Sequence, residues 1–152
     1  MPGMVLSPVP KSPMEPPGVT VDVVDEAGVD EWRHVLTDSW LPTEVAEQLF
    51  PTSLGTDPDV RLFTARLDGR PVGASVAIRT GDVSGVYGVV TVPTARRRGV
   101  GTAATWAAVG AGRSWGCGTI SLQASEMGYS SYRKMGFRTV LCYTTFSTAR
   151  QT

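Results

Sequence analysis

The sequence predicts one α+β domain with a mixed, mostly antiparallel sheet flanked by helices. Three β-branched segments separated by the turn dipeptides Asp68-Gly69 and Gly81-Asp82 indicate an antiparallel meander. An alanine-rich helical segment then leads to another apolar strand, and a crossover of this kind joins parallel strands. The chain has 152 residues, of which 41% are hydrophobic and 18% charged, so a single globular domain is expected.

The N-terminal segment differs in composition from the rest of the chain. Residues 1–18 are rich in proline and carry little apolar material, which predicts a flexible tail. The domain itself is expected to span residues 19–148. Its first strand is predicted over residues 19–24, where β-branched residues prevail.

Two helices are expected after this strand. Over residues 29–39, apolar residues recur at the spacing of one helical face and are expected to pack in the core: Val29, Trp32, Leu36 and Trp40. Pro42 then interrupts the helix, because proline cannot continue it. Thr43 can cap a second helix that continues to residue 49, with Val45 and Leu49 expected on its buried side.

The other strands are predicted from apolar runs bounded by glycine-containing turns. They are expected over residues 60–67, 71–79, 84–92, 119–124 and 138–146. Two further helices are expected over residues 101–113 and 126–135, and Gly136 is suited to end the second of them. The small residues of the first let it lie close to the sheet. Residues 84–124 should therefore form a parallel strand–helix–strand unit.

Composition and charge exclude several classes of partner. Fourteen basic and fourteen acidic side chains cancel, which argues against a nucleic-acid or anionic-membrane partner. The two cysteines, Cys117 and Cys142, are too few for a disulfide framework, and their spacing is not that of metal ligands. Both are therefore expected to be small core residues in a reducing compartment. No apolar stretch approaches ~20 residues and no signal peptide is evident, so a cytoplasmic location is the default expectation.

The most informative stretch of the chain is a run of three arginines and two glycines, Arg96-Arg97-Arg98-Gly99-Val100-Gly101. It lies between the third strand of the meander and the alanine-rich helix. The first N–H groups of a helix have no partner inside it, and the helix dipole adds about half a positive charge there. Glycine lets a bulky anion approach the backbone, and the arginines add positive potential. The run predicts a pyrophosphate-binding turn.

Two kinds of coenzyme fit this turn. Gly99, Gly101 and Ala104 match the dinucleotide fingerprint G-x-G-x-x-G/A, whereas the whole run matches Arg/Gln-x-x-Gly-x-Gly/Ala, the pattern of an acyl-coenzyme A site. A dinucleotide turn follows its strand directly, and an acidic residue comes about 20 residues later. Here residues 93–98 separate strand and glycine, and the window near residue 120 has no acid. Acyl-coenzyme A is therefore favoured, with a ligand-free glycine turn as the structural alternative.

A second motif lies in the C-terminal third, where Ser125 follows an apolar strand and the run Tyr132-Arg133-Lys134-Met135-Gly136-Phe137 comes next. The two motifs, in this order, resemble those of the GCN5-related N-acetyltransferase (GNAT) superfamily. The resemblance is specific over about residues 60–140. It implies the GNAT fold and a direct transfer of the acetyl group from acetyl-CoA to a primary amine.

The resemblance also implies which residues contact acetyl-CoA. The backbone of Val89, Val90 and Thr91 would form hydrogen bonds with the pantetheine amides, so that the pantetheine lies along the sheet like an added strand. The alternative is that residues 89–91 are an ordinary core strand without a ligand. Gly85 and Gly88 would ease a bulge that opens the sheet there. The pyrophosphate would lie on Arg96, Arg97, Arg98, Gly99, Val100, Gly101 and Thr102. Ser125 would contact the coenzyme, cap a helix or do both.

Tyr132 is the candidate catalytic residue. A phenol of pKa about 10 is protonated at neutral pH and can donate its proton to the thiolate that leaves. Tyr129 lies three residues earlier and is its local rival. No general base is evident, since residues 84–92 contain no acid and the single histidine, His34, lies on a helix where a structural role is commoner.

The acceptor is left open as a small-molecule or peptide amine, which the two helices of residues 29–49 would help to enclose. The family usually ends with two strands after its last helix, and only one fits here. The sheet would then have a truncated edge that a second copy of the chain could complete, giving a homodimer. The missing base and short C-terminus leave a second function open, a non-catalytic acyl-CoA-binding or regulatory module.

Overall fold

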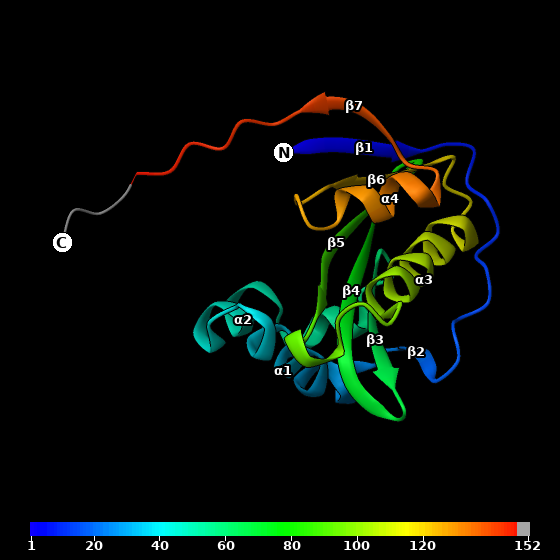
Figure 1. Ribbon diagram of the computed structural model, residues 1–152. Helices are drawn as coiled ribbons and strands as arrows, with labels where there is room; N and C mark the ends of the chain where they lie inside the picture. The colour runs from blue at the N-terminus through cyan, green and yellow to red at the C-terminus, as the bar shows by residue number, and fades with distance from the viewer. Residues whose placement is uncertain (149–152) are drawn as a thin grey trace.

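The computed structural model describes residues 1–148 and contains one mixed sheet of seven strands in the order β2-β3-β4-β5-β6-β1-β7 (Figure 1). The strands are β1 (Pro2–Leu6), β2 (Val19–Val23), β3 (Val60–Leu67), β4 (Arg70–Thr80), β5 (Val83–Thr91), β6 (Thr119–Gln123) and β7 (Arg138–Cys142). The α-helices are α1 (Val29–Ser39), α2 (Thr43–Leu49), α3 (Val100–Ser114) and α4 (Tyr129–Met135). The 3-10 turns are η1 (Glu26–Gly28), η2 (Thr52–Thr56) and η3 (Pro93–Ala95).

The pairing of the strands confirms the predicted fold class. Neighbouring strands are antiparallel throughout this sheet, except that β5 and β6 run parallel on either side of the α3 crossover. The predicted turn between β3 and β4 is also present, since Asp68 and Gly69 have φ of 50° and 83°. These two left-handed residues match the twist of a tight hairpin.

Helices cover both faces of the sheet. Trp32 and Leu36 of α1 pack with Leu62 of β3 on one face. On the other face, Val109 of α3 packs with Phe63 of the same strand. Because successive residues of a strand point to opposite faces, Leu62 and Phe63 belong to separate core clusters. The sheet is thus the middle layer, with α1 and α2 on one side and α3 and α4 on the other.

The strand β1 corrects the prediction that residues 1–18 form a flexible tail. Pro2–Leu6 pairs antiparallel with β6 on one side and with β7 on the other. Met4 and Leu6 point into the core, with 1% and 5% of their surface exposed. Proline is accepted at the first position of a strand, so Pro2 does not prevent the pairing. The prediction gave more weight to the proline content of the segment than to the short alternation of apolar residues in Pro2–Leu6.

The position of β1 also removes the reason for expecting a truncated sheet. β7 ends at Cys142 and not at residue 146 as predicted, and the slot between β6 and β7 is filled by the chain's own N-terminal strand. Figure 1 shows β1 lying beside β6 with β7 outside it. The sheet therefore does not need a second copy to fill this position.

Replacing Met4 by alanine is expected to lower the free energy of unfolding by about 2–5 kcal/mol, because a fully buried side chain leaves a cavity. Met14, which is 95% exposed, is the matched control, and Met14→Ala should change stability little. Urea unfolding of the two variants measures the difference. Equal midpoints would show that β1 does not belong to the folded sheet.

Four expected core residues are exposed instead. Trp40 is 69% exposed and lies one residue beyond the end of α1, so it does not continue the buried face of that helix. On the short helix α2, Ala46 is the buried residue, while Val45 and Leu49 are 38% and 60% exposed. Cys142 is exposed because it lies on the edge strand β7, whereas Cys117 is buried as predicted.

Candidate active site

The sheet opens between its two parallel strands. β5 and β6 pair only through Val83–Val86 and Thr119–Leu122. β5 continues to Thr91, and from Tyr87 onward no strand of the described residues pairs with the edge that faces β6. A strand edge without a neighbour offers unpaired backbone N–H and C=O groups. This stretch contains the predicted segment Val89–Thr91.

A β-bulge in β5 lies at this opening. Ala74 of β4 pairs with Val90, while Val76 pairs with Tyr87, so two residues of β5, Gly88 and Val89, lie opposite the single residue Ser75. Gly88 has φ of 58°, a left-handed conformation that glycine adopts without strain. The bulge confirms the predicted distortion and bends β5 where the two parallel strands separate.

Gly85 has a different role from the one predicted. A Cβ at Gly85 would lie 2.5 Å from the ring of Tyr87, so the glycine leaves room for this aromatic side chain. Tyr87 is 49% exposed and comes from the bulged part of β5. Sequence reasoning did not single it out, although a glycine two residues before an aromatic residue on the same strand face was the available signal.

The arginine–glycine run forms the turn that starts α3. Arg97 and Gly99 have φ of 63° and 81°, so two left-handed residues bend the chain into the helix. The first helical hydrogen bond runs from the Ala103 N–H to the Gly99 carbonyl. The N–H groups of Val100, Gly101 and Thr102 consequently have no acceptor inside the helix. They form the end of α3 that attracts an anion.

Space and charge at this turn both suit an anion. A Cβ at Gly101 would lie 3.3 Å from the Thr91 hydroxyl, which places this glycine between the first turn of α3 and the end of β5. Arg96 Nε donates to the Thr91 carbonyl at 3.3 Å, which ties the turn to β5. All three arginines are exposed, and residues 83–125 contain four arginines and no acid. The turn is therefore electropositive although the whole chain is neutral.

Tyr132 lies on α4, half-buried, with its ring packed edge-to-face on Phe137 at 5.9 Å between centroids. A Cβ at Gly128 would lie 2.8 Å from the ring, so this glycine makes room for it. Burial raises the pKa of Tyr132, and the Thr105 hydroxyl of α3 opposes the shift. Its phenol is held protonated at neutral pH, on the side of α4 that faces α3.

Tyr129 points elsewhere. Its hydroxyl lies 3.3 Å from the hydroxyl of Thr139 on β7. This hydrogen bond and the nearby Arg133 lower the pKa of Tyr129. The two tyrosines of α4 therefore have different partners, and Tyr132 is the one beside α3.

Ser125 begins the turn that leads into α4. Its hydroxyl accepts the N–H of Gly128 at 3.2 Å, and its carbonyl accepts the N–H of Tyr129 at 3.0 Å. Ser125 is therefore not the N-cap of the helix, because α4 begins only at Tyr129 and its N-cap is Gly128, without a side-chain cap bond. Ser125 also borders a cavity of about 390 Å³ beside the start of β1, so its exposed side chain is accessible to a ligand.

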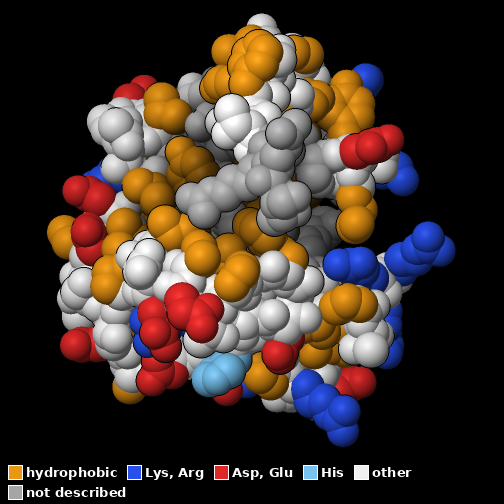
Figure 2. Space-filling model, turned by 90° about the vertical axis from the view of Figure 1, so that its left-hand side faces the viewer, with side chains coloured by type: hydrophobic (Ala, Val, Ile, Leu, Met, Phe, Trp, Pro, Cys, Tyr) orange, Lys and Arg blue, Asp and Glu red, His pale blue; other side chains and the backbone are white. Residues whose placement is uncertain are grey.

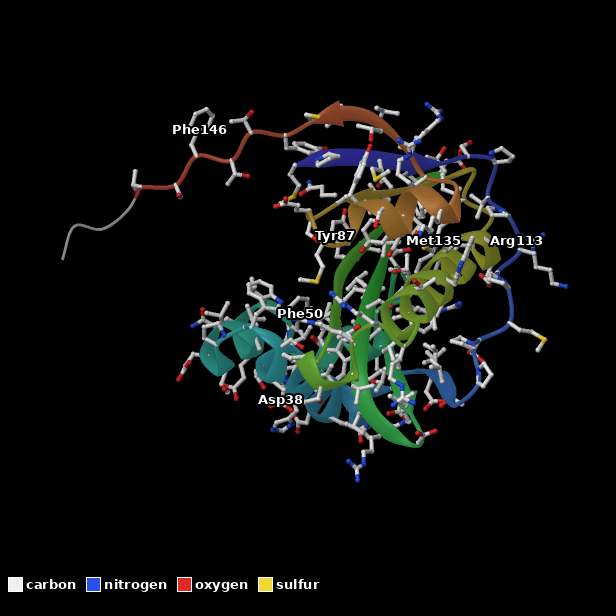
Figure 3. The ribbon with its side chains drawn as sticks, viewed as in Figure 1. Asp38, Phe50, Tyr87, Arg113, Met135 and Phe146 are labelled. Carbon is white, nitrogen blue, oxygen red and sulfur yellow. The ribbon has the colours of Figure 1, made fainter. Side chains whose placement is uncertain are left out.

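The face on which β5 and β6 separate carries hydrophobic side chains in its middle. Figure 2 shows these side chains between an acidic region below and to the left and basic side chains on the right. Tyr87 of β5 and Phe50, which follows α2, lie toward the same open side of the molecule in Figure 3. Phe50 packs edge-to-face on the buried Trp32 at 5.0 Å. Phe50 directly follows the two helices that the sequence analysis expects to enclose the acceptor.

His34 has a structural hydrogen bond. It is exposed on α1, and its Nδ1 lies 2.8 Å from the Asp30 carbonyl. Within residues 1–148, no group of three His, Cys, Asp or Glu side chains is placed to hold a metal ion. In the same part of the chain, no helix is long and apolar enough to cross a membrane.

Comparison with known proteins identifies the class of protein. The model of the acetyltransferase (GNAT) family matches residues 26–137. This protein therefore belongs to the GNAT family. A search of curated proteins gives no match.

Solved structures share the fold. A GCN5-related N-acetyltransferase from Kribbella flavida is 24% identical with a TM-score of 0.68. The match covers 91% of this chain and 53% of the Kribbella flavida chain. The chain thus spans about half the length of that relative. AAC(6')-Iy, solved with a CoA bisubstrate analogue, is 16% identical with a TM-score of 0.73. The match covers 86% of this chain and 98% of AAC(6')-Iy. An aminoglycoside acetyltransferase from an uncultured soil metagenomic sample is 18% identical with a TM-score of 0.68. The match covers 86% of this chain and 99% of that enzyme.

Proposed function

We propose that this protein is an N-acetyltransferase that moves an acetyl group from acetyl-CoA to a primary amine by direct attack. The observation that carries the proposal is the combination at one place of an unpaired β5 edge and the electropositive start of α3. An elongated ligand with amides at one end and a pyrophosphate in its middle matches both features. Family membership supports the same coenzyme.

In this proposal, acetyl-CoA binds mainly through the backbone. Residues 89–91 bond the pantetheine amides from the free edge of β5, and one N–H of this segment polarises the thioester carbonyl. Loss of such a donor costs about 3–4 kcal/mol of transition-state stabilisation. The N–H groups of residues 97–102 hold the pyrophosphate, with charge-assisted bonds that are about twice as strong as neutral ones. Arg96, which donates to the Thr91 carbonyl, and Ser125, which is exposed beside the start of β1, are the other residues assigned to coenzyme binding.

Tyr132 serves as the general acid. The neutral amine nitrogen attacks the thioester carbonyl carbon, and the C–S bond breaks as the tetrahedral intermediate collapses. The sulfur takes the phenolic proton and leaves as the thiol, while the proton released by the amine returns through solvent to the phenolate. The raised pKa of Tyr132 supports this role, because the acid must be protonated before the bond breaks.

The acceptor in this proposal is a small-molecule or peptide amine. Phe50 and Tyr87 lie on the open side next to β5, where an acceptor would reach the thioester. Two aromatic side chains there favour an amine attached to an apolar body.

Two measurements test the proposal. Isothermal titration with coenzyme A should give a dissociation constant in the micromolar range, and an amine panel should release free thiol from acetyl-CoA in proportion to acetylated product. Absence of coenzyme binding would contradict the proposal. Binding without thiol release from any amine would instead favour the non-catalytic module, which the absence of an evident base near β5 also favours.

A further inference from the structure

A buried hydroxyl lies one helical turn below the electropositive start of α3. Within residues 1–148, four hydroxyl side chains are buried, and Thr105 is one of them, with an exposed fraction of 0%. Its Oγ donates to the Gly101 carbonyl at 2.8 Å. In an α-helix this carbonyl already accepts the Thr105 N–H. The helix therefore does not need the hydroxyl bond to satisfy the Gly101 carbonyl, and the hydroxyl can serve another group.

That other group is the phenol of Tyr132. Tyr132 packs against the core cluster to which Ala108 and Val109 of α3 belong, which places α4 beside α3 at this point. Burial raises the pKa of Tyr132, and a side-chain hydrogen bond with Thr105 lowers it. A hydrogen bond that lowers the pKa of a phenol stabilises its charged form. Thr105 is thus the side chain of the described residues that can offer a proton to the phenolate oxygen.

The two partners of Thr105 compete for a single proton, because a hydroxyl has one proton to donate and two lone pairs that accept. While Tyr132 is protonated, the Thr105 proton can remain on the Gly101 carbonyl. Once Tyr132 has given its proton to the leaving sulfur, an unpaired charge in this half-buried site is costly. Rotation of the Thr105 O–H from the Gly101 carbonyl to the phenolate supplies the missing bond, and the carbonyl keeps its helical one.

We propose that Thr105 is a positioning residue for Tyr132, with a hydroxyl that turns from the Gly101 carbonyl to the phenolate as the thiol leaves. The inference rests on the proposed function, because it requires Tyr132 as the general acid. The O–H bond of Thr105 stays intact throughout: the phenolic proton goes to sulfur, and the phenolate regains a proton through solvent. Thr105 therefore acts on the step in which charge develops on Tyr132 and not on coenzyme binding.

The test removes the hydroxyl and keeps the shape of the side chain. Thr105→Val should lower kcat about tenfold, because a hydrogen bond to a charged group is lost, and leave the KM for acetyl-CoA unchanged. Thr105→Ser keeps the hydroxyl and should restore the wild-type kcat. Thr64→Val is the matched control, since Thr64 is 2% exposed on β3 and its hydroxyl has no partner, so kcat should not change. Wild-type kcat in Thr105→Val, or an equal loss in Thr105→Ser, would overturn the inference.

A double-mutant cycle separates this role from packing. Tyr132→Phe forms no phenolate, so adding Thr105→Val to it should lower kcat no further, whereas another tenfold loss would overturn the inference. If Thr105→Val does not fold, Thr105→Ala and Thr105→Ser decide the outcome, because they differ only in the hydroxyl: a tenfold difference in kcat is expected, and equal values would contradict it. Absence of turnover in the wild-type chain would contradict the proposed function and the inference together. Wild-type turnover that Thr105→Val matches would overturn the inference alone.

Discussion

Replacing Gly101 by glutamate is expected to reduce coenzyme A binding below detection while the chain remains folded. A Cβ at this position would lie 3.3 Å from the Thr91 hydroxyl, so a longer side chain extends between α3 and β5. Its carboxylate would lie among the free N–H groups at the start of α3 and neutralise the arginines. Gly101 lacks a left-handed φ, so the backbone tolerates the change. Titration calorimetry measures the binding, and thermal unfolding reports the fold.

Two substitutions at the same position separate charge from size. Gly101→Gln has the size of glutamate without its charge, and its affinity should lie between those of wild type and Gly101→Glu. Gly101→Ala requires the Thr91 side chain to shift by only a few tenths of an ångström, so the affinity should fall least. Wild-type affinity in Gly101→Glu would show that the coenzyme does not use this turn.

Tyr132→Phe is expected to lower kcat by about 10²–10⁴-fold and to leave the KM for acetyl-CoA unchanged. The substitution keeps the ring that packs on Phe137 and removes only the phenolic proton donor. Tyr129→Phe is the matched control on the same helix. The Tyr129 hydroxyl is engaged by Thr139 on β7, so kcat should stay near the wild-type value. Steady-state rates by thiol release distinguish the two, and equal losses in both would count against Tyr132 as the acid.

The pH dependence follows from the raised pKa of Tyr132. Burial places this pKa above the ordinary value of about 10, so the phenol is protonated throughout the neutral and mildly alkaline range. Because the folded pKa exceeds the unfolded one, its contribution to stability is complete below the unfolded pKa and is lost as pH rises through the folded pKa. The kcat profile below pH ~9 should therefore have the same shape in wild type and in Tyr132→Phe. A decrease of kcat with rising pH below pH ~9, seen in wild type but not in Tyr132→Phe, would contradict the assignment.

Local signals in the sequence were sufficient for much of the fold. The bounds of α1, α2 and β3 agree with the prediction, because their apolar spacing and the proline and Asp-Gly signals act over a few residues. The turn at Gly99 and the bulge at Gly88 were likewise expected, and both glycines have a left-handed φ. These features depend on neighbours along the chain and not on tertiary contacts.

Features that depend on distant contacts were not predictable. β1 is a strand because β6 and β7 are there to receive it, and nothing local in Pro2–Leu6 specifies these partners. The exposure of Trp40 depends on where α1 ends and on what packs over it. A cavity beside Trp106 is bounded by residues 12–16 on one side and α3 on the other, which a composition rich in proline does not reveal.

The most direct test follows individual backbone amides by NMR while coenzyme A is added to the isotope-labelled full chain. The account predicts the largest shifts at Val100, Gly101 and Thr102 of α3, and further shifts at Val89–Thr91 of β5. These are the amides that helix and sheet leave available to a ligand. Shifts confined to other parts of the chain, with these amides unmoved at saturating coenzyme A, would contradict it.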